Sequence, residues 1–170
     1  STPWFLLLLF RITIDAELNM YFMKPNSNLE PAELSYFRLN LLSYLRDSHP
    51  EKASDLSFIA GRGDLAAESY SDAIKSGLDH IQAAEIANEI LFKGLHFSPL
   101  NTIVEILWNE FSDEIPPGAA QQKATELLPD CKAVFIKYNL SDDYAETSEY
   151  QMLYTELSGT IMLLLEDELQ

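Results

Sequence analysis

The single cysteine and the three histidines offer the widest range of chemistry in this 170-residue chain. Cys131 has no second cysteine with which to form a disulfide or a zinc-type cluster. As a nucleophile it would need a histidine nearby to act as a base, whereas a lone cysteine in a helical sequence is far more often a small buried side chain. We therefore expect Cys131 to belong to the core.

The positions of His49, His80 and His96 do not match those of metal ligands. Neither a His-x-x-His nor a Glu-x-x-His pair is present, and His80 and Glu85 are five residues apart, which places them on different helix faces. His49 directly precedes Pro50, and His96 follows a glycine by two residues. These positions favour structural roles near helix ends.

The 27 acidic residues form many pairs, but two-carboxylate catalysis also needs a cleft and shifted pKa values. Gly61-Arg62-Gly63 is too short for a phosphate-binding loop and lacks the Lys-Ser/Thr pair that follows one. With Asp64 it contains the Arg-Gly-Asp tripeptide of integrin recognition, which is weak support when it stands alone. We interpret the glycines as a helix break and Asp64 as the next helix cap. The sequence assigns no catalytic, cofactor-binding or metal-ligating residue and predicts no cofactor.

Charge is the strongest polar signal. Eleven Lys and Arg against 27 Asp and Glu give a net charge of −16, which argues against direct binding of nucleic acids or anionic membranes. Residues 140–170 contain eight acids and no Lys, Arg or His. This acidic tail is interpreted as a solvated helix face, a docking site for a basic protein partner, or a mimic of nucleic-acid charge.

The first 23 residues differ from the rest of the chain. Trp4–Phe10 is an apolar run of seven residues, far shorter than the roughly 20 that a membrane-spanning helix needs. No basic segment precedes it and no small-x-small cleavage site follows it, as a signal peptide requires. We interpret residues 1–23 as an N-terminal extension and residues 24–170 as a single domain.

From about residue 28 onward, apolar residues recur every three or four positions, which is the period of an α-helix. No alternating strand pattern with hairpin turns is present, so the prediction is an all-α fold, a bundle of about seven to eight helices. The predicted helix boundaries, in chain order, are Pro31, His49-Pro50, Gly61 to Asp64, Gly77, Asp79 with Gln82, Gly94, Ser98-Pro99, residues 113–118 as a candidate hinge, Pro129, and Ser141 to Thr147.

Two helices carry specific expectations. Leu107, Trp108 and Phe111 share one face after Pro99, so we expect Trp108 to be buried. In the last helix the apolar residues predict an inward face, and the carboxylates an outward one. That outward face consists of Glu149, Glu156, Glu166, Asp167 and Glu168.

Five separated motifs resemble a family of small all-helical proteins of unknown function from Bacteroidetes, often linked to conjugative or mobile elements. They are Ala84–Leu91 (AEIANEIL), Gly94–Ser98 (GLHFS), Leu107–Phe111 (LWNEF), Leu140–Asp143 (LSDD) and Tyr154–Ile161 (YTELSGTI). The resemblance covers roughly residues 30–168. It implies a helical, cytoplasmic, bacterial protein and brings no established activity, cofactor or catalytic residue.

Three polar residues inside these motifs, Asn88, Asn109 and Glu110, lie beside apolar stripes and have either structural or functional roles. The favoured hypothesis is a non-enzymatic protein-interaction or regulatory factor, accessory to a bacterial mobile element, with a protein partner. The alternative is a small enzyme whose site is assembled between helices from carboxylates, His and Tyr.

Overall fold

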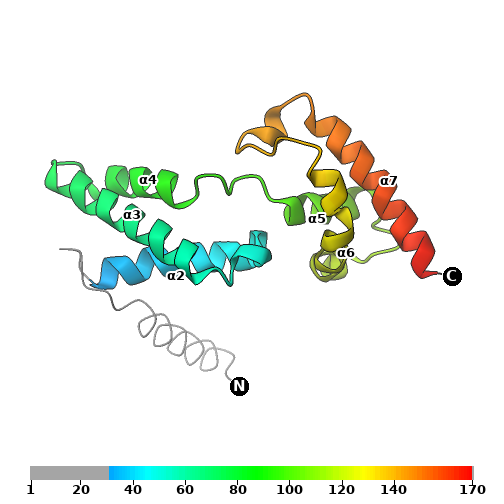
Figure 1. Ribbon diagram of the computed structural model, residues 1–170, viewed down its shortest axis with the longest axis horizontal. Coiled ribbons are helices and arrows are strands. Elements are labelled where there is room, and N and C mark those ends of the chain that lie inside the picture. The colour runs from blue at the N-terminus through cyan, green and yellow to red at the C-terminus, as the bar shows by residue number, and fades with distance from the viewer. Residues whose placement is uncertain (1–30, 170) are drawn as a thin grey trace, which may run out of the picture. The chain divides into compact units, whose positions relative to one another are not determined.

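The computed structural model describes residues 31–169, with side chains from Tyr36 onward, and this part of the chain is helical without strands. Its six α-helices (Figure 1) are α2 (Pro31–Ser48), α3 (Leu56–Lys75), α4 (His80–Leu91), α5 (Pro99–Glu110), α6 (Ala120–Phe135) and α7 (Tyr150–Glu168). Three short 3-10 helices lie at Pro50–Lys52, Pro117–Ala119 and Tyr144–Glu146. The all-α prediction is confirmed. The extension at residues 1–23, with its apolar run, lies outside the described residues.

The predicted count of seven to eight helices is wrong, because two predicted breaks fall inside single helices. The sequence predicts the first break at residues 61–64, yet α3 runs through them. Gly63 is buried against α2, where a Cβ atom would lie 2.7 Å from Cγ of Arg38. Asp64 accepts hydrogen bonds from Nε (2.9 Å) and Nη2 (2.8 Å) of Arg38. This glycine serves close helix packing, and Asp64 binds a neighbouring helix instead of capping its own.

The second predicted break, at Pro129, lies inside α6. A proline there removes one backbone hydrogen bond and costs about 3 kcal/mol. Leu127, Cys131 and Val134 are buried on either side of it, and burying such side chains is worth roughly 1.5–3 kcal/mol each. Pro129 is exposed, and so is Thr125, the residue whose carbonyl loses its donor. Burial of the three core side chains therefore outweighs the cost of the proline, and the helix continues through it.

The boundaries that rest on local capping are confirmed. Asp79 and Gln82 form a capping box, in which each side chain accepts a hydrogen bond from the other residue's backbone N–H, at 2.9 and 3.2 Å. Gly77 and Gly94 follow the ends of α3 and α4 in the left-handed region, with φ of +96° and +80°. Ser98 caps α5 by accepting a hydrogen bond from the Asn101 N–H.

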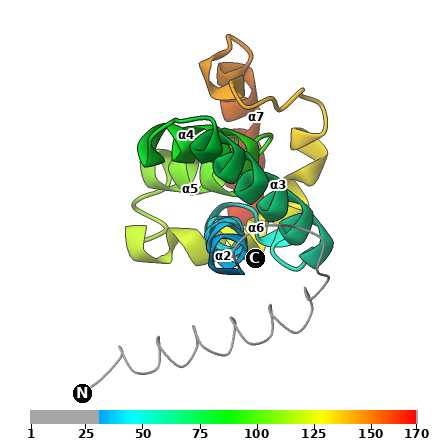
Figure 2. The same ribbon diagram turned by 90° about the vertical axis from the view of Figure 1, so that its left-hand side faces the viewer.

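The described chain divides into two compact units. Unit 1 consists of residues 31–44 and Lys52–Leu91, and unit 2 of Leu45–Glu51 and residues 92–169. In unit 1, α3 and α4 lie side by side (Figures 1 and 2). The buried apolar side chains of unit 1 are Phe37, Leu41, Leu42, Ile59, Ala66, Ala67, Ala73, Ala83, Ala87 and Leu91. Residues 113–118 connect α5 to α6 within unit 2, and their role as a hinge stays a prediction.

In unit 2, α6 and α7 pack on α5 around larger side chains. The buried cluster consists of Phe97, Leu100, Ile103, Val104, Ile106, Leu107, Ala120, Ala124, Leu127, Cys131, Val134, Phe135, Tyr144, Leu153, Leu157 and Ile161. Residues 45–51 are tied to this unit by their polar groups. The hydroxyl of Ser98 donates to the carbonyl of Ser48, and the amide of Gln121 donates to the carbonyl of Asp47 at 3.3 Å.

No helix in residues 31–169 combines the length and the apolar character needed to cross a bilayer.

Candidate functional site

Cys131 lies fully buried in α6, as expected of a core residue. Burial, and secondarily the negative charge of Asp130, raises the pKa of its thiol to about 11. The thiol therefore stays protonated at neutral pH, and a protonated thiol is a poor nucleophile.

The three histidines lie in separate environments. His49 is buried, and its Nε2 lies 2.8 Å from the carbonyl oxygen of Leu95, to which it donates. Nδ1 of His80 lies 2.6 Å from the hydroxyl of Tyr70 in unit 1. His96 is exposed. Among the described residues, no group of three or more His, Cys, Asp or Glu is placed to hold a metal ion.

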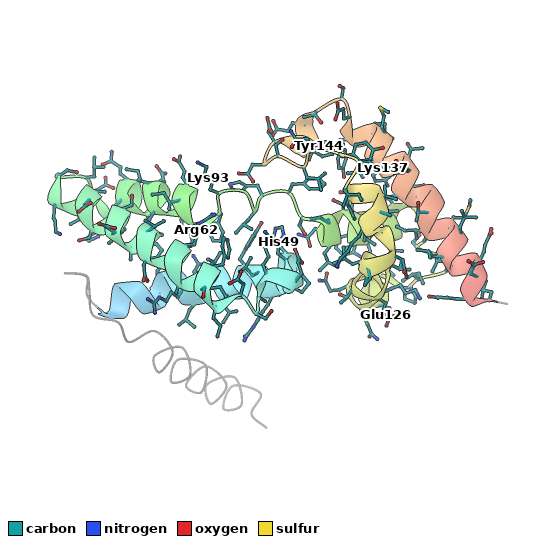
Figure 3. The ribbon with its side chains drawn as sticks, viewed as in Figure 1. His49, Arg62, Lys93, Glu126, Lys137 and Tyr144 are labelled. Atoms are coloured by element: carbon teal, nitrogen blue, oxygen red, sulfur yellow. The ribbon has the colours of Figure 1, made fainter. Side chains whose placement is uncertain are left out.

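The Arg-Gly-Asp tripeptide is helical, and its arginine serves the fold. Nη1 of Arg62 donates to the carbonyls of Ile90 and Leu91 at 3.1 and 3.5 Å, at the end of α4 (Figure 3). Its guanidinium also lies 4.9 Å from the ring centroid of Phe58. Arg62 thus supplies donors to carbonyls that a helix leaves without partners at its C-terminus.

Carboxylates and tyrosines do meet, between α5 and α7. The hydroxyl of Tyr150 donates to Oε2 of Glu105 at 3.1 Å, and that of Tyr154 donates to Oε1 of Glu110 at 3.0 Å. The Tyr154 hydroxyl also accepts a hydrogen bond from the side-chain amide of Asn109 at 3.3 Å. Together with a neighbouring tryptophan these residues form the tyrosine–glutamate strip, namely Glu105, Trp108, Asn109, Glu110, Tyr150 and Tyr154.

Helical spacing brings these groups together. Tyr150 and Tyr154 are four residues apart on α7, and Glu105 and Asn109 are four apart on α5, so each pair lies on one helix face. Below them the two helices share the buried core of unit 2. The ring of Tyr150 is further held edge-on by Phe97 and Tyr144, with each centroid 6.4 Å away.

The tyrosine hydroxyls remain hydrogen-bond donors over the physiological range. Burial, then the carboxylate of Glu105, raises the pKa of Tyr150 to about 12. Burial also raises the pKa of Tyr154, where Asn109 opposes the rise and Glu110 adds to it. Within residues 36–169, neither glutamate forms an ion pair with Lys or Arg. The strip therefore presents two exposed carboxylates that are oriented by tyrosine hydroxyls.

The prediction that Trp108 is buried is wrong, because 53% of the residue is exposed. The buried face of α5 includes Val104 and Leu107, and Trp108 follows Leu107 by about 100° around the helix axis. This rotation places the indole on the same side as Glu105. Its Nε1 donates to the carbonyl of Pro117 at 3.2 Å, which orients the ring at the surface of the protein.

The three polar motif residues are all exposed. Asn109 and Glu110 both bind Tyr154, whereas Asn88 lies on the open side of α4. Tyr150 and Tyr154 were missed as site residues, although their four-residue spacing on a helix with few other polar groups facing inward was a usable signal.

The predicted outward face of the last helix is confirmed, since its acids are exposed apart from Glu156, which is half-buried. Two of these acids also form ion pairs with lysines. Glu156 pairs with Lys137 and accepts a hydrogen bond from the Tyr138 hydroxyl at 2.7 Å (Figure 3 labels Lys137). These contacts, led by Lys137, lower the pKa of Glu156, and the bond to Glu156 raises the pKa of Tyr138 to about 12. Glu168 pairs with Lys123, with 2.7 Å between Nζ and Oε1.

The chemistry of the strip is recognition of a cation. A carboxylate binds an arginine side chain through two parallel hydrogen bonds, and an exposed indole attracts the same guanidinium through its ring face. Tyrosines with raised pKa values are donors and not nucleophiles at neutral pH.

Comparisons with known proteins agree with a family of unknown function. A family described as a domain of unknown function (DUF1896) matches residues 29–169. Among solved structures, the chain is similar to protein PG0816 from Porphyromonas gingivalis, with 43% identity and a TM-score of 0.75. That similarity covers 81% of this chain and 93% of the other. No curated protein matches the sequence.

Proposed function

The chain belongs to the DUF1896 family, and we propose that it is a non-enzymatic protein-interaction module whose tyrosine–glutamate strip binds a basic segment of a partner protein. One observation carries this proposal: Glu105 and Glu110 are held in place by Tyr150 and Tyr154 but have no cationic partner in the described chain. Exposed carboxylates that are already ordered lose less side-chain entropy when a ligand binds.

Arginine is the ligand side chain that fits the strip best. Its planar guanidinium makes two hydrogen bonds to one carboxylate and stacks on an aromatic ring, and here the exposed Trp108 follows Glu105 by three residues on α5. The wider charge of unit 2 supports the same partner, because its described residues contain 16 Asp and Glu against five Lys and Arg. Such a field speeds the approach of a basic segment.

The alternative of a small enzyme has weaker support. The strip combines carboxylates with tyrosines, but His49 bonds to the Leu95 carbonyl and His80 to Tyr70, so neither histidine serves the strip as a base. The resemblance to proteins linked with mobile elements supports a narrower form of the proposal, in which this module is a regulatory or accessory factor of such an element.

The direct test is a titration of the protein with short fluorescent peptides rich in Arg, in Lys or in Glu. The expected order of affinity is Arg, then Lys, with no binding of the Glu peptide, and the binding weakens as ionic strength rises. A Lys peptide that binds as tightly as the Arg peptide would show that the strip recognises positive charge alone and not the guanidinium group.

Matched charge variants locate the binding surface. The double variant Glu105→Gln with Glu110→Gln is expected to weaken binding of the Arg peptide by about tenfold or more. This corresponds to a loss of roughly 1.4 kcal/mol of binding free energy. Glu68→Gln with Asp72→Asn removes the same charge from the exposed face of α3 and is expected to have little effect. Equal weakening by both pairs would contradict a site at the strip. Trp108→Ala is expected to weaken the Arg peptide more than the Lys peptide.

A further inference from the structure

The outward face of α7 carries an apolar seam, and we propose that it docks a cationic amphipathic helix of a partner protein. The α7 seam consists of Met152, Thr155, Gly159 and Met162, with Leu163 beside them. It lies on the side of the helix away from the buried Leu153, Leu157 and Ile161. This goes beyond the proposed binding at the strip, because it uses another face of α7 and another chemistry.

The spacing of the seam is that of a helix–helix contact. Met152, Thr155, Gly159 and Met162 are separated by three, four and three residues, the pattern by which one helix packs along another. The large members are open to solvent: Met152 is 64% exposed, Met162 47% and Leu163 59%. Apolar residues scattered singly need no explanation, but here they are aligned along about 15 Å of one helix face.

Gly159 marks the centre of the seam. A glycine inside a helix is destabilising relative to alanine. A Cβ atom at Gly159 would meet nothing within 4 Å, so no neighbour in the described chain requires the glycine. Without a side chain, the helix backbone is open to close approach by a second helix. The hydroxyl of Thr155 donates to the Gln151 carbonyl at 2.9 Å, so its polar group is already bonded within α7.

Charge identifies the occupant. Glu149 and Glu166 lie at the two ends of the seam, and neither forms an ion pair in the described part of the chain. A second copy of the protein would bring a net charge of −16 and the same carboxylates to this face. The apolar run at residues 4–10 lies in a segment, residues 1–30, that has three acids and two cations. A helix with an apolar stripe and Lys or Arg near both ends complements the seam better than either.

Methionine suits such a surface. Its unbranched, polarizable side chain fills irregular gaps, so Met152 and Met162 can adapt to the apolar side chains of an incoming helix. Binding of this kind lays the apolar face of a partner helix along the seam and its flanking cations beside the carboxylates.

The test is a titration of the full-length protein with a synthetic amphipathic peptide of Leu and Lys, about 18 residues or five helical turns long. A scrambled peptide of the same composition, without a continuous apolar face, is the comparison. The expected result is at least about tenfold tighter binding of the amphipathic peptide, with a gain of helical circular dichroism on binding. Equal binding of the two peptides would overturn the proposal, since charge alone would then account for it.

Two glycines provide a matched pair of variants. Gly159→Lys places a cationic side chain in the centre of the seam and is expected to weaken binding of the amphipathic peptide at least about tenfold. Gly61→Lys makes the same change on α3, at a helical position with equally open space, and is expected to leave binding unchanged. Leu163→Ala is expected to weaken binding without altering charge. Unchanged binding by Gly159→Lys would rule out the seam.

The other occupants give distinct results. A dimer in sedimentation that Gly159→Lys dissociates would assign the seam to a second copy. If the double variant Leu7→Asp with Leu8→Asp binds the amphipathic peptide more tightly than the unchanged protein does, the chain's own N-terminal segment competes for the seam and is its occupant. Either result overturns a partner helix. The outcome is also separable from that at the strip, because Gly159→Lys is expected to leave the Arg peptide bound, and Glu105→Gln with Glu110→Gln to leave the amphipathic peptide bound.

Discussion

Unit 1 and unit 2 are both helical, yet their cores are built from side chains of different size. Half of the buried apolar side chains of unit 1 are alanines, and Gly63 lets α3 approach Arg38 on α2. Unit 2 buries mostly Leu, Ile, Val and aromatic side chains. Small side chains hold helices together by close approach, whereas large ones do so by removing apolar area from water. We therefore expect unit 1 to be sensitive to added volume and unit 2 to lost volume.

The two units also differ in how they use their charged side chains. In unit 1 the arginines are used internally, Arg38 on Asp64 and Arg62 on the carbonyls at the end of α4. Unit 2 orients Glu105 and Glu110 with tyrosine hydroxyls and leaves their charge uncompensated. Residues 31–44 and 52–91 contain eight acids against four cations, so the surplus of negative charge is concentrated in unit 2. Both proposed binding surfaces lie there.

The largest expected effect is a truncation in the core of unit 2. Leu157→Ala removes a fully buried side chain of α7 and is expected to lower the free energy of unfolding by about 2–5 kcal/mol. Chemical denaturation measures this change. The comparison in unit 1 is Ala67→Gly, also fully buried, which is expected to cost about 1 kcal/mol. Similar losses in the two variants would break the contrast between the cores.

Next in size is a methyl group added to unit 1. Gly63→Ala forces Cβ against Cγ and the backbone of Arg38 and is expected to cost about 1–3 kcal/mol of stability. Gly61→Ala, two residues away in the same helix and in open space, is expected to gain about 0.5–1 kcal/mol. Thermal unfolding of both variants distinguishes a packing contact from a helix-propensity effect. A gain of stability from both would show that the approach of α2 and α3 tolerates a larger residue.

A smaller effect concerns alkaline pH and unit 2. The pKa values of Tyr138 and Tyr150 are raised to about 12, and those of Tyr144 and Tyr154 are also raised. A tyrosine that stays protonated longer in the folded state contributes stability below its unfolded pKa of about 10 and loses it as the pH rises towards 12. Denaturation midpoints are therefore expected to fall between about pH 10 and 12. Tyr150→Phe is expected to reduce this fall, and an unchanged midpoint over the range would contradict the assignment.

The smallest expected effect is at the end of α7. Glu166→Gln with Asp167→Asn removes negative charge near a helix C-terminus and is expected to gain at most about 1 kcal/mol at low salt. Glu168→Gln removes the partner of Lys123 and is expected to lose a similar small amount. Opposite signs in urea denaturation would sharpen the distinction between paired and unpaired acids. The same sign in both would show that the ion pair adds nothing.

The features that the sequence predicted correctly are those decided within a few residues. The Asp79–Gln82 capping box, the Ser98 cap and the terminal glycines are local hydrogen bonding and backbone geometry. Gly63 and Pro129 were interpreted wrongly, because their helices continue through contacts with distant parts of the chain. Helical spacing alone also did not show where the buried face of α5 ends, which decided the exposure of Trp108.

The candidate site lay almost wholly beyond sequence reasoning. Glu105 and Tyr150 are 45 residues apart, and no local pattern indicates which acids among 27 meet a tyrosine hydroxyl. The net charge did point to a basic partner, but not to the surface that binds it. That surface depends on how α5 and α7 pack, which only the three-dimensional structure supplies.

The ties between residues 45–51 and the rest of unit 2 bear on the order in which the chain folds. The bonds from His49, Ser48 and Asp47 span 46, 50 and 74 residues. Contacts this distant in sequence slow folding, because the entropy of closing a long loop is lost before the contacts are gained. During synthesis, the end of α2 is made 50 residues before Ser98 and 74 residues before Gln121. A fragment that begins at Phe92 lacks residues 45–51 altogether. Its Ser98 hydroxyl, which is buried in the intact protein, therefore loses its hydrogen-bond acceptor.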